Sequence, residues 1–219
     1  MRDAWIFFDL DGTLTDSGEG IIKCARLALS HYDIYPPTDE EMRVFVGPPL
    51  RDTFAKFGVP VSKVEEAVRI YRSRYTTVGK YENTPYEGIL ELLSRLRDEG
   101  YRLFVATSKP EDMAVDILNH FDMAKYFDMI CGAVRTADRD SKEKVISYLL
   151  DQAPKDALPS SVVMVGDTHF DVVGANAHGI PTVGVAWGYG KAEDMLAAGA
   201  IAVADTPQAL YDILTQEHL

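Results

Sequence analysis

Cysteine is scarce in this 219-residue chain and so, relative to the acids, are lysine and arginine. Neither Cys24 nor Cys131 stands in a CxxC or histidine-rich context, so neither a disulfide framework nor a zinc site is indicated. We expect both cysteines to be reduced and buried. Lys and Arg number 22 against 34 Asp and Glu, which gives a formal net charge of -12. This balance disfavours nucleic acid as a partner, but not an anionic small molecule, because local charge can oppose net charge.

Long apolar runs are also absent. No uninterrupted apolar stretch approaches the ~18 residues of a membrane-spanning helix, and Met1 is followed by Arg2 and Asp3 rather than by a signal-type segment. We therefore expect a cytoplasmic protein without a membrane partner. The hydrophobic content of 47% is ordinary for a soluble globular protein and is sufficient for a sizeable core.

The texture of the sequence changes twice along the chain. Residues 5–9 are typical of a short, buried parallel strand. From about Gly18 to Tyr81, apolar residues recur at helical spacing, and Pro- and Gly-containing breaks divide the stretch into about four helices without a convincing strand. From Pro85 onward, strand and helix patterns alternate again.

This alternation predicts an α/β fold with a doubly wound, parallel, Rossmann-like sheet. Residues 1–16 and 83–219 would form the α/β core, and residues 17–82 an inserted all-helical domain. After the insert, we expect strands at 103–107, 129–131, 162–165, 182–185 and 201–203, and helices near 87–99, 111–120, 142–152, 171–178 and 207–216.

Polar residues follow the first predicted strand, in the segment Asp9-Leu10-Asp11-Gly12-Thr13. In extended chain, the i, i+2 spacing puts the Asp9 and Asp11 carboxylates on one face. Gly12 then allows a tight turn. Two carboxylates on one face repel each other, so a divalent cation, a shared proton or a basic partner must compensate them.

Two later strands also end in polar clusters. The strand at 103–107 runs into Thr107-Ser108-Lys109-Pro110, and the strand at 162–165 precedes Gly166-Asp167-Thr168-His169-Phe170-Asp171. In doubly wound sheets, sites form at the carboxyl ends of the strands. The three clusters are therefore expected to converge on one rim of the sheet.

The order of these segments resembles the haloacid dehalogenase-like (HAD) superfamily, and within it the phosphoglycolate-phosphatase-like group. The DxDGT segment at 9–13, the strand-terminal Ser108, a downstream lysine and the GDxxxD segment at 166–171 occur in the family's order. The helical insert between the first two motifs matches the position of a family cap domain. The resemblance spans nearly the whole chain.

The resemblance implies hydrolysis of phosphate esters through an aspartyl-phosphate. Asp9 would attack phosphorus, since a carboxylate is ionised at neutral pH without help from a base. Asp11 would protonate the leaving oxygen and then take a proton from the hydrolytic water. Mg²⁺ would bridge Asp9 and the phosphate, with Asp167 and the Asp11 backbone carbonyl as further ligands.

Further groups would bind the phosphate by the same resemblance. The Ser108 hydroxyl is the first candidate, although Ser108 is also a candidate N-cap of the helix after Pro110. Backbone amides near Leu10–Gly12 and Lys109 would join it, with Thr13 beside them. The Lys109 side chain is either a substrate contact or an exposed lysine at the rim. Arg51 either binds a substrate anion or is an ordinary residue at a helix N-terminus.

The family's lysine has no rigid signature, and the candidates in this chain are Lys142, Lys144, Arg135 and Arg139. Lys142 is preferred because Ser141 can cap the following helix, which puts Lys142 near the strand ends. There it would neutralise charge on the Asp9–phosphate adduct.

The last motif contributes a second acid as well as Asp167. Asp171 would orient a metal-bound water or Lys142 rather than bind the cation directly, or else be an acid favoured at a helix N-terminus. His169 is expected to lie at the rim without a ligand role.

The predicted substrate is a small phosphorylated metabolite: phosphoglycolate, a nucleotide or a sugar phosphate. A β-phosphoglucomutase-like phosphosugar mutase, an inorganic pyrophosphatase and a non-catalytic phospho-acceptor module stay open as alternatives. Asp11 disfavours the dehalogenase and phosphonate-cleaving branches, which lack an acid there. We expect a monomer or a homodimer.

Overall fold

The computed structural model describes residues 4–36, 38–134, 139–152 and 161–216. The chain forms two compact units, one of residues 1–15 and 85–219 and the other of residues 16–84. The short strands β2 (Thr15–Asp16) and β3 (Thr84–Pro85) lie where the chain passes from one unit to the other. None of the described helices is long and apolar enough to cross a membrane.

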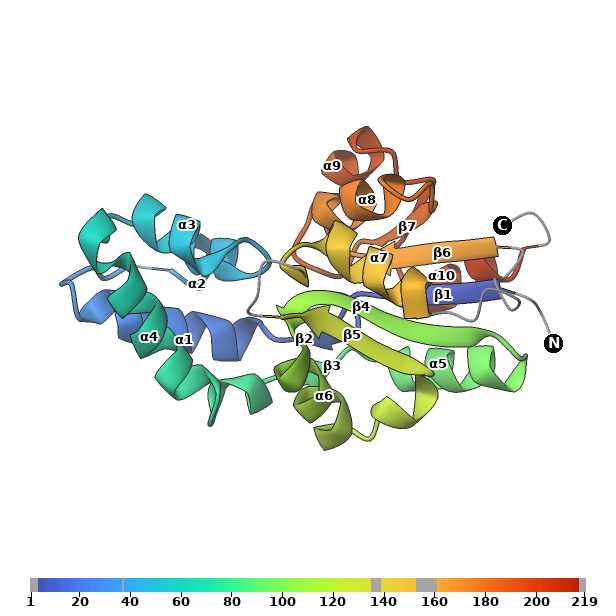
Figure 1. Ribbon diagram of the computed structural model, residues 1–219, viewed down its shortest axis with the longest axis horizontal. Helices are drawn as coiled ribbons and strands as arrows, with labels where there is room; N and C mark the ends of the chain where they lie inside the picture. The colour runs from blue at the N-terminus through green and yellow to red at the C-terminus, as the bar shows by residue number, and fades with distance from the viewer. Residues whose placement is uncertain (1–3, 37, 135–138, 153–160, 217–219) are drawn as a thin grey trace. The chain divides into compact units, whose positions relative to one another are not determined.

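The larger unit is built on a six-stranded sheet with the order β5-β4-β1-β6-β7-β8 (Figure 1). Every neighbouring pair in it is parallel. The strands are β1 (Ala4–Phe8), β4 (Arg102–Pro110), β5 (Met129–Ala133), β6 (Ser161–Gly166), β7 (Thr182–Val185) and β8 (Ala202–Ala204). Strand β1 pairs with β4 on one side and β6 on the other, so the strand order reverses there. Doubly wound sheets bind their ligands at such a reversal.

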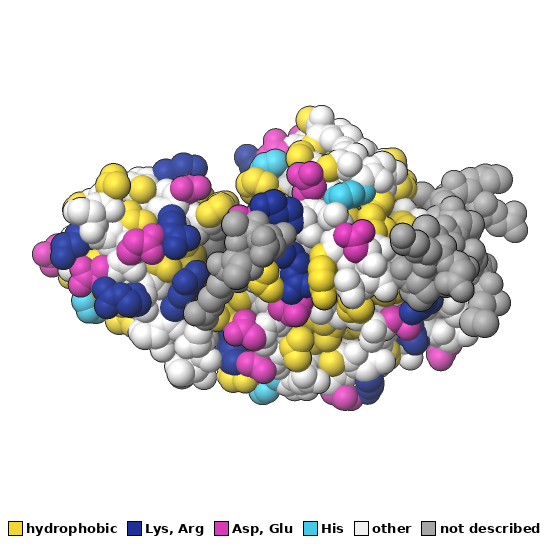
Figure 2. Space-filling model, in the orientation of Figure 1, with side chains coloured by type: hydrophobic (Ala, Val, Ile, Leu, Met, Phe, Trp, Pro, Cys, Tyr) yellow, Lys and Arg dark blue, Asp and Glu magenta, His cyan; other side chains and the backbone are white. Residues whose placement is uncertain are grey.

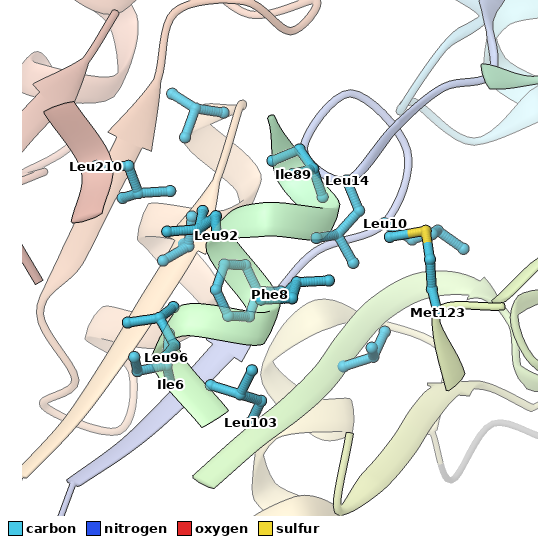
Figure 3. Packing of buried hydrophobic residues seen from close by; sticks show 14 of the residues in the cluster. Ile6, Phe8, Leu10, Leu14, Ile89, Leu92, Leu96, Leu103, Met123 and Leu210 are labelled. Atoms are coloured by element: carbon cyan, nitrogen blue, oxygen red, sulfur yellow. The ribbon is translucent and has the colours of Figure 1, made fainter. Parts of the chain in front are cut away.

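Strand β1 shows why the sheet is covered on both faces. Ile6 and Phe8 belong to one apolar cluster, whereas Trp5 and Phe7 belong to another. Successive side chains of a strand point to opposite faces, so an uninterrupted apolar strand needs two covering layers. Figure 3 shows the first cluster, in which Phe8 packs among residues of α5 and its neighbours.

Helices supply these layers. They are α5 (Ile89–Asp98), α6 (Glu111–His120), α7 (Lys142–Gln152), α8 (His169–Asn176), α9 (Ala192–Ala197) and α10 (Pro207–Leu214). Leu93 of α5, Ile117 of α6 and Leu210 of α10 join the cluster of Ile6 and Phe8. Val145 of α7 and Ala175 of α8 join the opposite cluster. The predicted α/β architecture is therefore confirmed.

Helix α9 was not predicted from sequence patterning, and neither were the two-residue strands β2 and β3. Helix α9 has only six residues and buries Met195 alone among them, so no helical period can be read from it. Strand β4 is also longer than predicted, since it continues to Pro110 and pairs with Ala133 beyond an irregularity in register.

The smaller unit is helical in the part that the structure describes. Its α-helices are α1 (Gly18–Ser30), α2 (Asp39–Met42), α3 (Leu50–Lys56) and α4 (Val64–Tyr75), with 3₁₀ turns at Arg43–Phe45, Val61–Lys63 and Gly79–Tyr81. Rings of Phe45, Phe54 and Tyr71 pack edge to face in its interior. Cys24 here and Cys131 in the larger unit are both free and buried, as predicted.

Candidate active site

The pairing of β1 with β6 brings the first and last acidic segments together. Phe8 stands opposite Val165, and the Asp9 amide donates to the Val165 carbonyl at 2.9 Å. Asp9 therefore leaves β1 beside the point where β6 runs into Asp167. The carboxylate oxygens of Asp9, Asp167 and Asp171 lie within 4.8 Å of one another. The convergence predicted from the strand ends is present.

Lys142 is the first residue of α7 and reaches into this cluster. Its Nζ lies 2.9 Å from Asp9 Oδ1 and 2.8 Å from Asp171 Oδ1, and donates to the Ala106 carbonyl at 2.7 Å. An ammonium has three protons, so the three acceptors satisfy it. Burial opposes its charge, but the carboxylates of Asp171 and Asp9 raise the pKa of Lys142.

Local structure explains why Lys142, and not its neighbours, takes this place. Ser141 Oγ accepts from the Lys144 amide at 3.4 Å, which starts the helix as predicted. Lys144 lies at the surface and pairs with Asp140 at 2.7 Å. Arg139 is buried away from the cluster and pairs with Glu111 at 2.8 Å. The fourth candidate, Arg135, lies outside the described residues.

The acids carry more negative charge than Lys142 balances. Burial raises the pKa of Asp167 well above its usual range, and the charges of Asp171 and Asp9 add to the effect. Burial also raises the pKa of Asp9, with Lys142 opposing the shift. No cation lies within ion-pair distance of Asp167 among the described residues. A hard divalent cation with oxygen ligands fits this excess of buried carboxylate.

Asp171 is oriented toward Lys142 by hydrogen bonds from Thr168. One of its oxygens faces the ammonium, and the other accepts from the Thr168 amide at 3.0 Å and the Thr168 hydroxyl at 2.9 Å. Within the described part of the chain, Asp167 has only two hydrogen-bond donors, the Thr13 hydroxyl and the Tyr189 amide, and so keeps more acceptor capacity toward a cation. The predicted contact of Asp171 with Lys142 is thus present, and His169 is exposed at the start of α8.

Asp11 is paired with Lys109. The Lys109 Nζ lies 2.9 and 2.6 Å from the two Asp11 carboxylate oxygens, and its side chain is only 5% exposed. Lys109 is therefore not an exposed lysine at the rim. Of the three kinds of compensation that the Asp9–Asp11 spacing left open, basic partners are present: Lys109 of β4 for Asp11 and Lys142 of α7 for Asp9.

The hydroxyl next to Asp9 belongs to Thr107 rather than to Ser108. The Thr107 hydroxyl bonds the Asp9 carboxylate and accepts from the Lys109 amide at 3.2 Å. Ser108 is exposed, and it does not cap α6, whose N-cap position is occupied by Pro110. Thr107 and Lys109 share one side of β4 because strand residues alternate. The sequence predicts that this strand ends at 107. Only its continuation to Pro110 shows that the Thr107 and Ser108 side chains point to opposite sides of β4.

In the turn after β1, several groups that were predicted to bind phosphate make hydrogen bonds within the protein. The Leu10 amide donates to Asp9 Oδ1 at 2.7 Å, and the Gly12 amide donates to the Thr15 carbonyl at 2.8 Å. The Thr13 hydroxyl donates to Asp167 Oδ1 at 3.1 Å. Gly12 has a φ of +84°, a conformation that favours glycine.

Arg51 belongs to the helical unit. It begins α3 together with Leu50, and its guanidinium pairs with Glu65 of α4. Its side chain is 59% exposed. The role of Arg51 at a substrate stays a prediction.

Comparisons with known proteins agree with this geometry. Residues 6–185 match the model of the haloacid dehalogenase-like hydrolases. The chain is 45% identical over 188 residues to the tyrosine-protein kinase PtkA of Mycobacterium tuberculosis, covering 86% of this chain and 64% of that protein. It is 39% identical over 203 residues to a 5'-nucleotidase of Pseudomonas aeruginosa, covering 90% and 91% of the two chains.

Solved structures extend the likeness to both units. A haloacid dehalogenase-like family hydrolase from Streptococcus pneumoniae, SP0104, superposes with a TM-score of 0.89 at 32% identity, covering 96% of this chain and 98% of that one. PtkA itself superposes with a TM-score of 0.85 at 42% identity, covering 97% and 98%. The chain belongs to the haloacid dehalogenase-like hydrolases.

Proposed function

We propose that this protein is a phosphatase that hydrolyses a small phosphorylated metabolite through an aspartyl-phosphate on Asp9. The observation that carries the proposal is the surroundings of the Asp9 carboxylate. It is bonded by Lys142 and Thr107, lies beside Asp167, and precedes a second acid by two residues. A nucleophile held in this way needs no separate base.

The chain's own residues divide the work between two steps. An Asp9 oxygen attacks phosphorus while Asp11, in its protonated form, gives its proton to the leaving oxygen, which releases the alcohol. In the second step Asp11 takes a proton from water, and the oxygen of that water attacks phosphorus, which frees Asp9 and inorganic phosphate. Positioned acid–base help of this kind is worth roughly 10²–10⁴-fold in rate. Lys142 neutralises charge on the adduct throughout.

Asp9 and Asp167 would hold the divalent cation, which we propose to be Mg²⁺. When bound, it would neutralise charge between the carboxylates and the phosphate. The raised pKa values of the two acids support a site that is incomplete without additional positive charge.

The helical unit, residues 16–84, is proposed to be a cap that selects the substrate. Its sequence enters directly after the segment that carries Asp9 and Asp11. Because relatives are named 5'-nucleotidase and pyrophosphatase, we include nucleoside monophosphates and pyrophosphate with phosphoglycolate and sugar phosphates as candidate substrates.

Transfer to a tyrosine hydroxyl is a second candidate, because a relative with 45% identity is named a tyrosine-protein kinase. Asp9 would attack the γ-phosphorus of ATP and release ADP, and a tyrosine phenol, losing its proton to Asp11, would then attack the aspartyl-phosphate in place of water and free Asp9. The same Asp9 chemistry would then serve a different acceptor.

The test is release of inorganic phosphate from phosphoglycolate, nucleoside monophosphates, hexose phosphates and pyrophosphate, with and without Mg²⁺. ATP with a tyrosine peptide is run in parallel. We expect metal-dependent turnover of one substrate class, lost in Asp9→Asn and retained in the control Asp98→Asn, whose acid is exposed on α5. Turnover that survives Asp9→Asn would contradict the nucleophile, and peptide labelling without hydrolysis would favour the kinase.

A further inference from the structure

The loop after β7, residues 187–190, contacts the site although no sequence motif pointed to it. Its sequence is Trp187-Gly188-Tyr189-Gly190. We refer to these four residues as the β7 loop. Strand β7 pairs with β6, so the loop emerges next to Asp167 at the end of the neighbouring strand.

The β7 loop bonds the acid that is proposed to bind the cation. The Tyr189 backbone amide donates to Asp167 Oδ2 at 2.9 Å. The Thr13 hydroxyl donates to the other oxygen, Oδ1, at 3.1 Å. Each oxygen of a carboxylate can accept more than one hydrogen bond. Both oxygens of Asp167 are therefore oriented and still able to bind a cation.

Trp187 links the two donors. Its indole N–H donates to the Thr13 backbone carbonyl at 3.1 Å. The same Thr13 bonds Asp167 through its hydroxyl, and Tyr189, two residues after Trp187, bonds Asp167 from the other side. These contacts form a closed ring through the β1 turn, the acid and the β7 loop. A rotation of the Asp167 side chain would break at least one of them.

Three glycines approach Asp167 so closely that none of them could carry a side chain without a clash. A Cβ on Gly188 would lie 2.3 Å from the Asp167 Cβ, and one on Gly190 would lie 2.1 Å from the Asp167 carbonyl oxygen. A Cβ on Gly12 would lie 2.2 Å from Asp167 Oδ2. Two of these three contacts involve backbone or Cβ atoms, which cannot move aside as a flexible side-chain end can. The close packing of these glycines thus adds to the two hydrogen bonds in holding Asp167 in place.

We propose that the β7 loop positions Asp167 for the divalent cation, and that Trp187 is a positioning residue acting through Thr13. This inference rests on the proposed function for the cation itself. Groups that orient a metal ligand typically change metal affinity by roughly 10–100-fold when mutated. A carboxylate already fixed by two donors and three glycines needs no reordering when the cation arrives.

The test is titration of the substrate-free protein with Mn²⁺ or Mg²⁺ by calorimetry, which is independent of turnover. Trp187→Phe keeps most of the ring and removes the indole N–H. We expect its metal dissociation constant to rise roughly 10-fold, with kcat at saturating metal nearly unchanged. The matched control is Trp5→Phe, which alters the other tryptophan. Trp5 lies on β1, is 2% exposed and packs against Phe104 of β4. That change should lower stability but leave metal affinity as in the wild type.

Two further variants guard against a simple folding defect. Gly188→Ala should weaken metal binding at least as much, since its Cβ meets Asp167 directly. Thr13→Val combined with Trp187→Phe should be less than additive, because both act through one ligand. Metal affinity equal to wild type in Trp187→Phe and Gly188→Ala would overturn the inference. A wild-type protein that binds no divalent cation would overturn the proposed cation as well, so the two failures are distinguishable.

Discussion

Among the described residues, the most buried ion pairs of this chain lie in its α/β unit, although both units also carry exposed pairs. In the helical unit, the pairs Arg51–Glu65 and Lys63–Glu66 have side chains between 42 and 69% exposed. Figure 2 shows basic and acidic side chains interspersed on the visible face of that unit. In the α/β unit, Lys142 is 5% exposed and pairs with Asp171, which is fully buried.

Exposed and buried ion pairs differ in what they contribute to the protein. Exposed ion pairs contribute little to stability, since water and salt screen them. Buried ion pairs cost desolvation energy that apolar residues of similar size would avoid. Lys142, Asp167 and Asp171 are buried at the strand ends and Asp9 is partly buried there, which indicates that this chain retains them for a reason other than stability. The predictions below test this contrast.

The largest effect is expected from Lys142→Met. It leaves Asp9 and Asp171 without their ammonium, and breaking a buried pair typically costs about 3–5 kcal/mol. Urea unfolding should show this loss, and phosphate release should disappear. The control is Lys144→Met, two residues along the same helix, where the pair with Asp140 is exposed. That variant should unfold as the wild type does. Equal stability of the two variants would contradict the contrast.

A smaller, pH-dependent effect is expected from Asp167→Asn in protein stripped of metal by a chelator. The folded-state pKa of Asp167 is raised above its ordinary value of 3.8, so the folded protein binds the proton more tightly than the unfolded chain. The contribution of Asp167 to wild-type stability should therefore fall as pH rises from about 3.8 through the folded pKa. The loss is about 1.4 kcal/mol for each unit by which the pKa is raised.

Asp167→Asn lacks this titration, so its stability relative to wild type should increase as pH rises toward neutrality. Urea unfolding at a series of pH values measures the difference, and Asp98→Asn serves as the exposed control. Adding Mg²⁺ at neutral pH should reverse the order, because only the wild type gains cation-binding energy. A difference that is constant with pH would show that burial of Asp167 carries no charge penalty.

The acids of this site were accessible from sequence, whereas their surroundings were only partly so. Asp9, Asp11 and Asp167 follow apolar strands, and strand ends in a parallel sheet share one edge, so their convergence needs only the strand assignments. The family resemblance called for a lysine, and the helix start beside Ser141 favoured Lys142 among the candidates. These inferences use local patterns of strand and helix, which the sequence encodes directly.

The remaining contacts depend on register and space, which spacing along the chain does not encode. The bond between the Thr107 hydroxyl and Asp9 could be predicted only by knowing that β4 continues to Pro110. The β7 loop acts through a backbone amide, an indole N–H and missing Cβ atoms. None of these carries a charge or a ligand atom that a motif search recognises. The Gly-x-Gly pattern after Trp187 was the only available signal.

The two adjacent hydroxyls provide a test of intermediate size. Thr107→Val removes the bond to Asp9 with little change of shape, and a hydrogen bond to a charged group is worth about 1.5–3 kcal/mol. Ser108→Ala alters an exposed side chain and should stay within ~0.5 kcal/mol of the wild type. Urea unfolding separates the two. If the Ser108 hydroxyl donates to the substrate phosphate as predicted, Ser108→Ala should raise KM although it leaves the stability unchanged.

Arg51→Ala is expected to have the smallest effect on the folded protein and gives the contrast its strictest test. Arg51 and Glu65 are both more than half exposed, so their pairing should not change the unfolding transition beyond experimental error. Lys63→Ala, which removes a similar exposed pair with Glu66, should behave identically in that measurement. The two variants should differ only in kinetics: a substrate anion bound by Arg51 would make KM rise in Arg51→Ala while kcat is unchanged, because lost ground-state binding appears in KM alone. Identical kinetics in both variants would leave Arg51 with the surface role of its neighbours and confine the chemistry of this chain to the buried charges at the strand ends.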